Sequence, residues 1–254
     1  MPTFDLELRH YLASFMSDHR RELLPRLLLN RTRHLALVVE DVYQSHNASA
    51  CLRSCDCFGV QDVHIVENQN EYLVNDNVAL GASQWLTLQR YQDTTACLQS
   101  LKSRGYVIVM TSPHETDCEL ETYDISRPTA LVFGNEKRGA SQAVRQQADH
   151  VMSIPMYGFT ESFNISVAVA ICLHHLIWRM RESGVEWRLG EVEREELLNE
   201  WVRVASETRV EKLEQYFREQ RESGKPLQAA AWPDWANVSP NPPEHRSNRI
   251  ADRM

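Results

Sequence analysis

The segment ALVFGNEKRGAS, residues 130–141, carries two glycines separated by four residues, which is the glycine spacing of a phosphate-binding loop. A nucleotide hydrolase also needs Lys and then Ser or Thr after the second glycine, because the ammonium reaches the terminal phosphates and the hydroxyl holds magnesium. Here Gly139 is followed by Ala140 and Ser141, and Lys137 lies inside the loop. The sequence therefore argues against a nucleotide hydrolase and predicts a turn that serves another ligand.

Two further polar segments carry side chains suited to chemistry. The segment HNASACLRSCDCFG follows an apolar run and holds Asn47 and Arg53 six residues apart, and IPMYGFTESFNISVA places Ser162 and Asn164 before a long apolar run. A guanidinium grips phosphate or stabilises an oxyanion, and amide and hydroxyl groups orient a reacting group. Taken by itself, Arg53 is equally well explained as a surface arginine paired with Asp56.

No metal site is expected. Cys51, Cys55 and Cys57 lack the paired CxxC spacing of structural zinc sites, and we interpret them as small core residues of one helix. His174 and His175 are adjacent, and successive helical positions point about 100° apart, so the two rings do not form a ligand pair on one helix face. The acidic segment at 115–124 lacks the spacing of a magnesium site and is interpreted as a solvated connection.

The elements that position these segments alternate along the chain. Apolar runs predict strands at 35–42, 62–66, 85–91, 106–110, 129–133 and 151–155. Helices are predicted at 47–59, 93–105 and 164–180, with Asp93 as an N-cap. This alternation is typical of an α/β domain whose mainly parallel sheet is flanked by helices. Ligands of such sheets bind at the carboxyl ends of the strands, where the polar segments follow.

The two ends of the chain differ from the middle. Residues 3–29 predict an amphipathic helix or helix pair, and 191–223 is rich in Glu and Arg with apolar residues at helical spacing. The tail at 239–254 is proline-rich and predicted to be irregular or disordered. We therefore expect an N-terminal helical extension at 1–30, a central domain at 31–185, and a helical, partly irregular C-terminal extension at 186–254.

Composition limits the classes of partner. The formal net charge of −8 argues against indiscriminate nucleic-acid binding, which depends on neutralised phosphates, although arginines make the first 34 residues mildly positive. No apolar run approaches the roughly 20 residues of a membrane span, and no secretion signal precedes the first helix. The protein is expected to be soluble and cytoplasmic, with no membrane partner.

Three ordered motifs resemble those of the SPOUT-class RNA 2'-O-ribose methyltransferases, the TrmH/SpoU family. The resemblance runs from about residue 10 to 185 and is nearest to the enzymes that methylate a guanosine of the tRNA D-loop. The first motif is Asn47, Arg53 and Gly59; the second is Gly134, Glu136, Lys137 and Gly139; the third reads IPMYG and SFNISVA, with Phe163 and Ile165 where leucine and valine are usual. Beyond residue 190 the chain departs from the pattern.

The resemblance implies a fold, a cofactor and a set of roles. The fold would contain a deep trefoil knot in the C-terminal part of the domain, and S-adenosylmethionine would bind there. Cofactor contacts are expected from Thr111, Gly134, Ile154, Met156 and Phe163, and catalytic roles for Arg53, Asn47, Glu136, Ser162 and Asn164. The family works as a homodimer with its active site at the subunit interface, so residues 164–183 should bury against a partner.

The resemblance also implies the reaction, methylation of a ribose 2'-hydroxyl in structured RNA, most specifically guanosine 18 of tRNA. Ribosomal RNA as substrate and a noncatalytic RNA-binding factor are the alternatives. Because a guanidinium stays protonated, Arg53 either stabilises developing charge or grips phosphate, and the general-base role stays open. Charge alone predicts RNA contacts for Arg20, Arg21, Arg26 and Arg138.

Overall fold

The computed structural model describes residues 6–70, 72, 79, 81–206, 209–230, 232, 235 and 238–241. The chain forms two compact units, Thr32–Arg188 and a second one made of Met1–Arg31 with Leu189–Met254. The two extensions that the sequence predicted separately therefore belong to one unit. No helix within the described ranges is long and apolar enough to cross a membrane.

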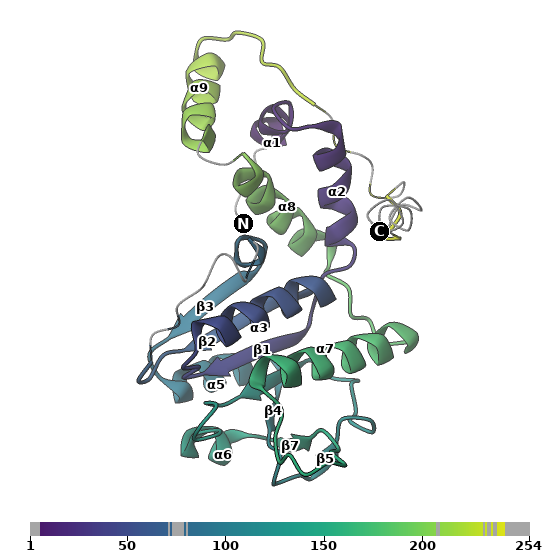
Figure 1. Cartoon of the computed structure of the whole chain (residues 1–254). Helices are drawn as coiled ribbons and strands as arrows, with labels where there is room; N and C mark the ends of the chain where they lie inside the picture. Colours follow the sequence, from purple (N-terminus) through teal and green to yellow (C-terminus); the bar gives the residue numbers. More distant parts are fainter. Residues whose placement is uncertain are drawn as a thin grey trace, which may run out of the picture. The chain divides into compact units, whose positions relative to one another are not determined.

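The central unit is built on a seven-stranded sheet in the order β3-β2-β1-β6-β4-β7-β5, and every pairing between neighbours is parallel (Figure 1). The strands are β1 (Thr32–Glu40), β2 (Val60–Val66), β3 (Thr87–Tyr91), β4 (Val107–Thr111), β5 (Cys118–Glu119), β6 (Thr129–Phe133) and β7 (His150–Ser153). All six predicted strands are confirmed. The segment 115–124, interpreted as a solvated connection, also contains the edge strand β5, whose two residues have no periodicity to detect.

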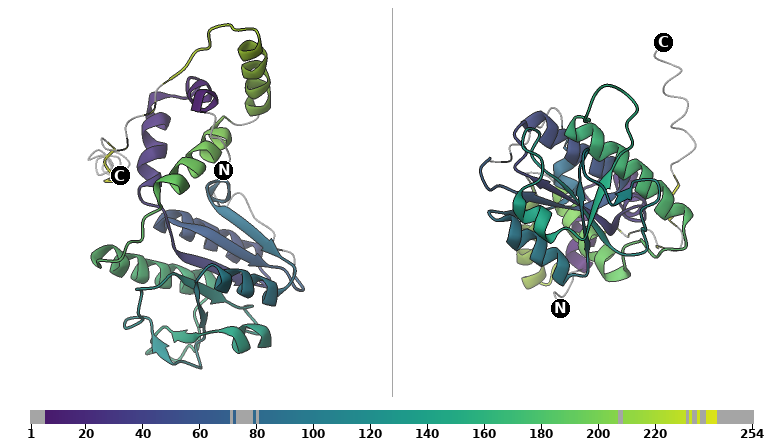
Figure 2. Two further views of the ribbon diagram at one scale, coloured as in Figure 1. Left: turned by 180° about the vertical axis from the view of Figure 1, so that it is seen from behind. Right: turned by 90° about the horizontal axis from the view of Figure 1, so that it is seen from below.

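Helices cover both faces of this sheet, as Figures 1 and 2 show from the front and from behind. Alternate residues of each strand point to opposite faces. One face packs against α3 (Ser45–Phe58) and α7 (Ile165–Glu182), with Leu37, Ile65 and Leu131 in its core. The other face packs against α5 (Thr94–Ser103) and α6 (Gln142–Gln147). A short 3-10 helix, η1 (Ala82–Trp85), precedes β3.

Local signals explain the helix ends. The Asp93 side chain accepts a hydrogen bond from Ala96 N and caps α5, as the sequence predicted. Helix α3 ends at Gly59, whose φ of 79° is the left-handed conformation that favours glycine after a helix. Helix α6 was not predicted, because its six residues are polar apart from two and give no helical apolar pattern.

The cysteines of α3 divide between two environments. Cys51 and Cys55 are fully buried in the core beneath α3 and α7, which confirms their interpretation as small core residues. Cys57 is exposed, so that interpretation was wrong for the third cysteine. Positions 51 and 55 lie one helical turn apart and share a face, whereas position 57 is about 160° from 55 around the helix.

The second unit consists of helices. Helices α1 (Leu6–Ala13) and α2 (Asp18–Leu28) form the predicted N-terminal pair, and α8 (Glu191–Ala205) and α9 (Val210–Glu222) form the C-terminal one. Trp201 is buried, with the Arg31 guanidinium 5.0 Å from its ring centre. Part of the segment after α9 is hydrogen-bonded to α1, because Ala230 N donates to His10 O at 3.0 Å. Residues 242–254, most of the predicted irregular tail, lie outside the described residues.

Candidate active site

A cavity of about 620 Å³ opens at the carboxyl ends of β4, β6 and β7 in the central unit. Thr111 ends β4, Gly134 follows β6, Ile154 follows β7, and Asn164 precedes α7; all four line the cavity. Parallel strands bring these segments to one edge of the sheet, where ligands of α/β proteins bind. The volume lies within the range of small-molecule and cofactor sites.

The glycine loop after β6 closes on itself. Asn135 and Gly139 exchange two backbone hydrogen bonds, of 3.0 and 2.8 Å, and the Asn135 side chain accepts from the backbone N–H groups of Lys137 and Arg138. A phosphate-binding loop keeps such N–H groups free to cradle its ligand. Because this loop uses these amides internally, its geometry agrees with the sequence argument against a nucleotide hydrolase.

Two glycines make the loop possible. Gly139 has a φ of 69°, a conformation that side chains with a Cβ rarely adopt. Gly134 lies directly against the backbone of Gly139 and Ala140, and a Cβ there would come within 2.5 Å of three of their atoms. The wall of the cavity therefore depends on the absence of a side chain at Gly134.

A chain of hydrogen bonds joins three of the predicted catalytic residues beside this loop. Asn47 Nδ2 donates to Glu136 Oε1 at 2.9 Å, and Asn164 Nδ2 donates to Asn47 Oδ1 at 3.1 Å. Asn47 is buried, so its amide has exchanged water for these partners. The three residues come from α3, the glycine loop and the N-cap of α7, and the chain links these elements at the cavity.

The surroundings of Glu136 keep its carboxylate charged. Partial burial acts to raise its pKa, but hydrogen bonds from Asn47 and from the backbone N–H groups of Tyr43 and Gln44 outweigh this and lower the pKa below its ordinary value of 4.5. The carboxylate is therefore an acceptor at neutral pH. The neighbouring Tyr43 ring lies 4.8 Å from Lys137 Nζ.

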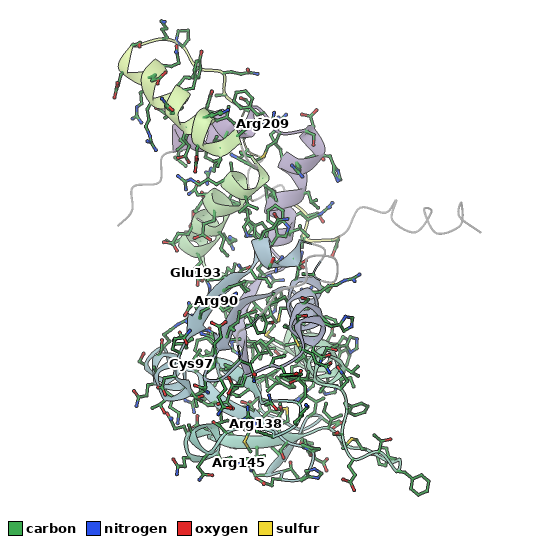
Figure 3. The ribbon with its side chains drawn as sticks, turned by 60° about the vertical axis from the view of Figure 1, so that its left-hand side comes forward. Arg90, Cys97, Arg138, Arg145, Glu193 and Arg209 are labelled. Carbon is green, nitrogen blue, oxygen red and sulfur yellow. The ribbon has the colours of Figure 1, made fainter. Side chains whose placement is uncertain are left out.

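The predicted cofactor residues Thr111, Gly134, Ile154, Met156 and Phe163 all line the cavity, as do Ser162 and Arg138. The Thr111 hydroxyl donates to Val132 O at 3.0 Å, which joins the ends of β4 and β6. Arg138 donates to the Gln69 side chain. Figure 3 labels Arg138 and Arg145, which both line the cavity.

Arg53 lies apart from this group. It is exposed on α3 and does not line the cavity, and its guanidinium forms no hydrogen bond or ion pair with the described part of the chain, Asp56 included. Six residues correspond to about 120° of rotation around a helix, so a helix that turns Asn47 inward turns Arg53 away. Within one subunit, Arg53 therefore lies apart from the other residues of the motifs.

The predicted RNA-contacting arginines of the other unit have structural partners. Arg20 Nη1 donates to Ala205 O at 3.2 Å at the end of α8, and Arg21 donates to Met16 O at 2.9 Å beyond the end of α1. Arg26 is half-buried near the end of α2. Two of these side chains thus satisfy carbonyls at helix ends, a role that charge patterning does not reveal.

Sequence reasoning missed several polar cavity residues, among them Ser112, His114 and Arg145. Ser112 and His114 follow β4, and their place directly after an apolar strand was the signal that could have identified them. Arg145 lies on the unpredicted helix α6 and forms an ion pair of 2.6 Å with Glu115. No local signal pointed to it.

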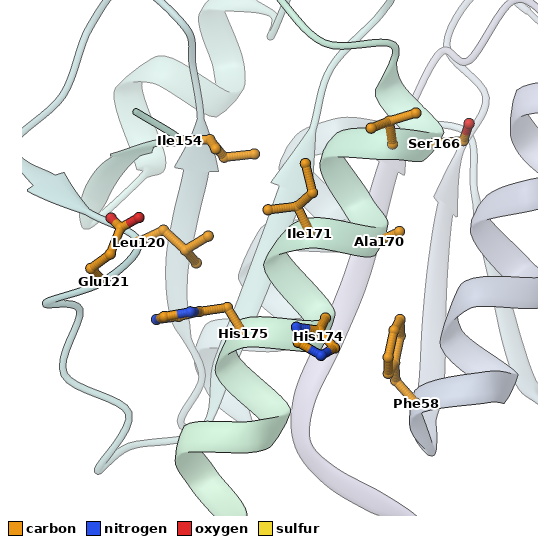
Figure 4. A pocket seen from close by; sticks show the side chains of 10 residues that line it. Phe58, Leu120, Glu121, Ile154, Ser166, Ala170, Ile171, His174 and His175 are labelled. Atoms are coloured by element: carbon orange, nitrogen blue, oxygen red, sulfur yellow. The ribbon is translucent and has the colours of Figure 1, made fainter. Parts of the chain in front are cut away.

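A second cavity, of about 470 Å³, lies on the outer side of α7 (Figure 4). Phe58, Ile154, Ile171 and His174 contribute to a lining that is mostly apolar, and the rings of Phe58 and His174 meet edge to face at 5.8 Å. Val167 and Trp178 on the same helix are 45% and 59% exposed. Helix α7 thus carries an apolar outer face, and Ile154 lines both cavities.

The central unit matches known proteins over most of its length. Residues 34–174 match the SpoU rRNA Methylase family. A tRNA (guanosine(18)-2'-O)-methyltransferase of Borreliella burgdorferi is 41% identical over 186 residues, which are 73% of this chain and 85% of that protein. The enzyme of the same name from Thermus thermophilus is 31% identical and covers 74% of this chain and 97% of its own length.

A solved structure agrees with these sequence matches. The TrmH/SpoU tRNA modifying enzyme of A. aeolicus superimposes with a TM-score of 0.67 at 30% identity, over 73% of this chain and 95% of that one. The family match covers the glycine loop, the Asn47–Glu136–Asn164 chain and most of α7. The chain belongs to the SpoU rRNA methylase family.

Proposed function

We propose that the protein uses S-adenosylmethionine to methylate the 2'-hydroxyl of guanosine 18 in the D-loop of tRNA. The observation that carries the proposal is the hydrogen-bonded chain of Asn47, Glu136 and Asn164 beside a cofactor-sized cavity. Its support is membership of a methylase family whose relatives include the tRNA guanosine methyltransferases described above. The cytoplasm, where tRNA is modified, is the proposed compartment.

The residues around the cavity suit this cofactor. Ile154, Met156 and Phe163 offer apolar surface for an adenine ring, and the glycine loop and Thr111 bring backbone groups to the same wall. The bound cofactor supplies a methyl group on a sulfonium, which is electrophilic without a metal. The role of the cavity residues is to hold that methyl group in line with the ribose oxygen, because alignment provides much of the rate in such transfers.

The remaining chemistry concerns the hydroxyl. The ribose hydroxyl must lose its proton to water as its oxygen bonds to the methyl carbon, and the carbon–sulfur bond would break to leave S-adenosylhomocysteine. A preorganised cation beside the oxygen lowers the barrier by stabilising the alkoxide character that proton loss creates. We assign this role to Arg53, which stays protonated and also suits a neighbouring RNA phosphate. Glu136, Asn47, Ser162 and Asn164 orient the ribose and the loops around it.

The position of Arg53 supports a shared active site. Since Arg53 of the same chain lies outside the cavity, we propose that the protein is a homodimer in which each subunit supplies Arg53 to its partner's cavity. The apolar outer face of α7, with Val167, Trp178 and the second cavity, supplies a surface to bury. Ile154 would then connect the dimer contact to the cofactor wall.

Subunit mixing tests this arrangement. An Arg53→Ala dimer and a Glu136→Ala dimer should each be inactive, and mixed dimers should regain activity because each contains one intact site. If Arg53 acts within its own chain, both sites of a mixed dimer stay defective and no activity returns. Trp178→Glu should yield monomers by sedimentation analysis with the secondary structure retained.

The fold and the RNA surface complete the proposal. We propose that β6, β7 and α7 thread to form the trefoil knot of the family, which would explain why three loops distant in sequence share one cavity. We propose further that the second unit contacts RNA through Arg20, Arg21 and Arg26. At the rim of the cavity, Arg138 also contacts RNA. Arg26 and Arg138 give the cleaner tests, because replacing Arg20 or Arg21 also removes a hydrogen bond to a helix-end carbonyl.

Salt dependence measures these RNA contacts. Replacing a phosphate-contacting arginine should weaken tRNA binding and lower the slope of affinity against salt by about one unit. Unchanged affinity and slope for Arg26→Ala and Arg138→Ala would exclude both contacts.

A methyl-transfer assay tests the reaction itself. The protein is incubated with S-adenosylmethionine and unmodified tRNA transcript or ribosomal RNA, and the digested product is analysed by mass spectrometry. We expect 2'-O-methylguanosine on tRNA, lost with Arg53→Ala and not rescued by Arg53→Lys, because lysine lacks the planar fork. A tRNA transcript that carries adenosine in place of guanosine 18 should not be methylated.

The same assay also tests two alternative functions. Methylation confined to ribosomal RNA would keep the mechanism and replace the substrate, and the name of the family favours that alternative. Cofactor binding without methylation of either RNA would indicate a noncatalytic RNA-binding factor.

A further inference from the structure

Glu40 is a buried acidic residue that the proposed reaction does not use. It ends β1, its exposed fraction is 2%, and no ion pair to it is found among the described residues. Burying a carboxylate is costly unless hydrogen bonds replace its hydration. The partners that provide them indicate what the residue does.

Three hydrogen bonds converge on this carboxylate. Ser141 N donates to Oε2 at 2.9 Å, the Ser141 hydroxyl donates to Oε1 at 2.7 Å, and the Thr94 hydroxyl donates to Oε1 at 2.5 Å. Thr94 is the first residue of α5, and Ser141 is the N-cap of α6 and the end of the glycine loop. Glu40 therefore fixes the end of the loop to β1, an inner strand of the sheet.

This anchor directly follows a residue of the cavity wall in the sequence. Ala140 precedes Ser141, and the backbone of Gly139 and Ala140 presses on Gly134 so closely that no Cβ fits there. All three of these residues line the cavity. A shift of Ser141 would move Ala140 directly and change the contact with Gly134.

We infer that Glu40 is a positioning residue for the cofactor, holding the glycine loop against Gly134 through Ser141 while remaining outside the cavity. This inference rests on the proposed function, because the cavity must take S-adenosylmethionine for the loop to matter in this way. Its consequence is specific. Loss of Glu40 should raise the dissociation constant and the KM for the cofactor, whereas kcat at saturating cofactor should stay near that of the wild type.

A merely structural role predicts something different, and Asp62 supplies the control. Asp62 is 1% exposed, lies on the adjacent strand β2 and points to the same face of the sheet, but its ion pairs are with Arg33 at 3.0 Å and Arg104 at 2.8 Å. Neither partner lines the cavity. Asp62→Asn should lower thermal stability without changing cofactor affinity.

The experiment is calorimetric titration of the full chain with S-adenosylmethionine, alongside thermal unfolding and steady-state kinetics. Glu40→Ala should weaken cofactor binding about tenfold or more, the worth of hydrogen bonds to a charged group. Glu40→Gln keeps one acceptor oxygen and should fall between. Ser141→Ala should weaken binding too, and its effect should not add to that of Glu40→Gln because both act on one contact.

The outcomes separate the two proposals. If Glu40→Ala binds the cofactor with wild-type affinity, the role of Glu40 is overturned and the proposed function stays intact. If Glu40→Ala fails to fold, wild-type affinity in both Glu40→Gln and Ser141→Ala has the same meaning. Equal losses of affinity in Asp62→Asn and the Glu40 variants would reduce the effect to general destabilisation and also overturn it. Absence of binding in the wild type would refute the proposed function itself, and the inference with it.

Discussion

Replacement of Gly134 by alanine tests whether the glycine loop forms the cofactor wall. The new Cβ would lie 2.3 Å from Ala140 N and 2.4 Å from Gly139 C, whereas ordinary contact begins at 3.4 Å. The obstructing atoms are backbone, which cannot rotate aside as the end of a long side chain does. The loop must therefore retreat by about 1 Å, at a cost of about 1–3 kcal/mol in stability, as in other overpacked sites.

A displacement of this size should have a larger effect on function than on folding. A misplacement of about 1 Å in a positioning element can lower the rate about 100-fold, and we expect a comparable fall in kcat/KM for Gly134→Ala. Cofactor affinity by calorimetry and single-turnover methylation of tRNA measure the effect. Thermal unfolding of the same samples establishes that the variant is folded.

Two other glycines serve as matched controls. A Cβ on Gly158 would meet only Thr160 N, at 4.0 Å, so Gly158→Ala should behave as the wild type. A Cβ on Gly139 meets nothing within 4 Å, but its φ of 69° strains alanine by about 1–2 kcal/mol. Gly139→Ala should thus lose stability with less loss of binding. If folded Gly134→Ala binds the cofactor as tightly as Gly158→Ala, the loop does not form the cofactor wall.

Three further predictions concern the neighbourhood of the site. Burial opposes the charged form of Glu136, but hydrogen bonds from Asn47 and two backbone amides outweigh it and lower the pKa below the ordinary 4.5, so the charged carboxylate stabilises the fold above pH 4.5. This stabilisation is lost as the pH falls through the lowered pKa. In urea unfolding between about pH 6 and pH 3, the wild type should therefore lose more stability than Glu136→Gln, and equal losses would contradict the network. Asn47→Ala and Asn164→Ala should show a non-additive loss of stability or turnover in a double-mutant cycle, since each removes the same 3.1 Å bond, and strict additivity would deny the coupling. The exposed Cys57 should be the first cysteine to react with a thiol reagent in the folded protein, because burial raises the pKa of Cys51, Cys97 and Cys172 to about 12. A Cys57→Ser protein that still shows the fast phase of thiol modification would refute this.

Structural features that depend only on residues close together in the sequence were predictable. Several of the six strand runs are nearly continuously apolar because the sheet is covered on both faces, and that pattern is visible locally. Asp93 was identifiable as a cap because capping requires only the next helical turn. The edge strand β5 and the short helix α6 escaped because two and six residues carry no usable period.

The sequence predicted which segments meet at the cavity rather than how their side chains are arranged. The residues named in advance from the glycine loop and from the segment at 154–165 line one cavity, as parallel strand ends require. The exposure of Arg53 and the helix-end partners of Arg20 and Arg21 were not predictable, because spacing along a chain does not say which face of a helix meets which neighbour.

The sequence by itself determined six strands and three helices of the central unit, the residue types of its three motifs and the absence of the lysine that a phosphate loop needs. The tertiary structure alone decided that Asn47 meets Glu136 across 89 residues and Asn164 across 117, and that Glu40 reaches Ser141 across 101. The physical reason is the strand order, since β6 inserts between β1 and β4 and brings loops distant in sequence to one edge. Local periodicity specifies each strand, but only packing of the whole sheet selects its neighbours.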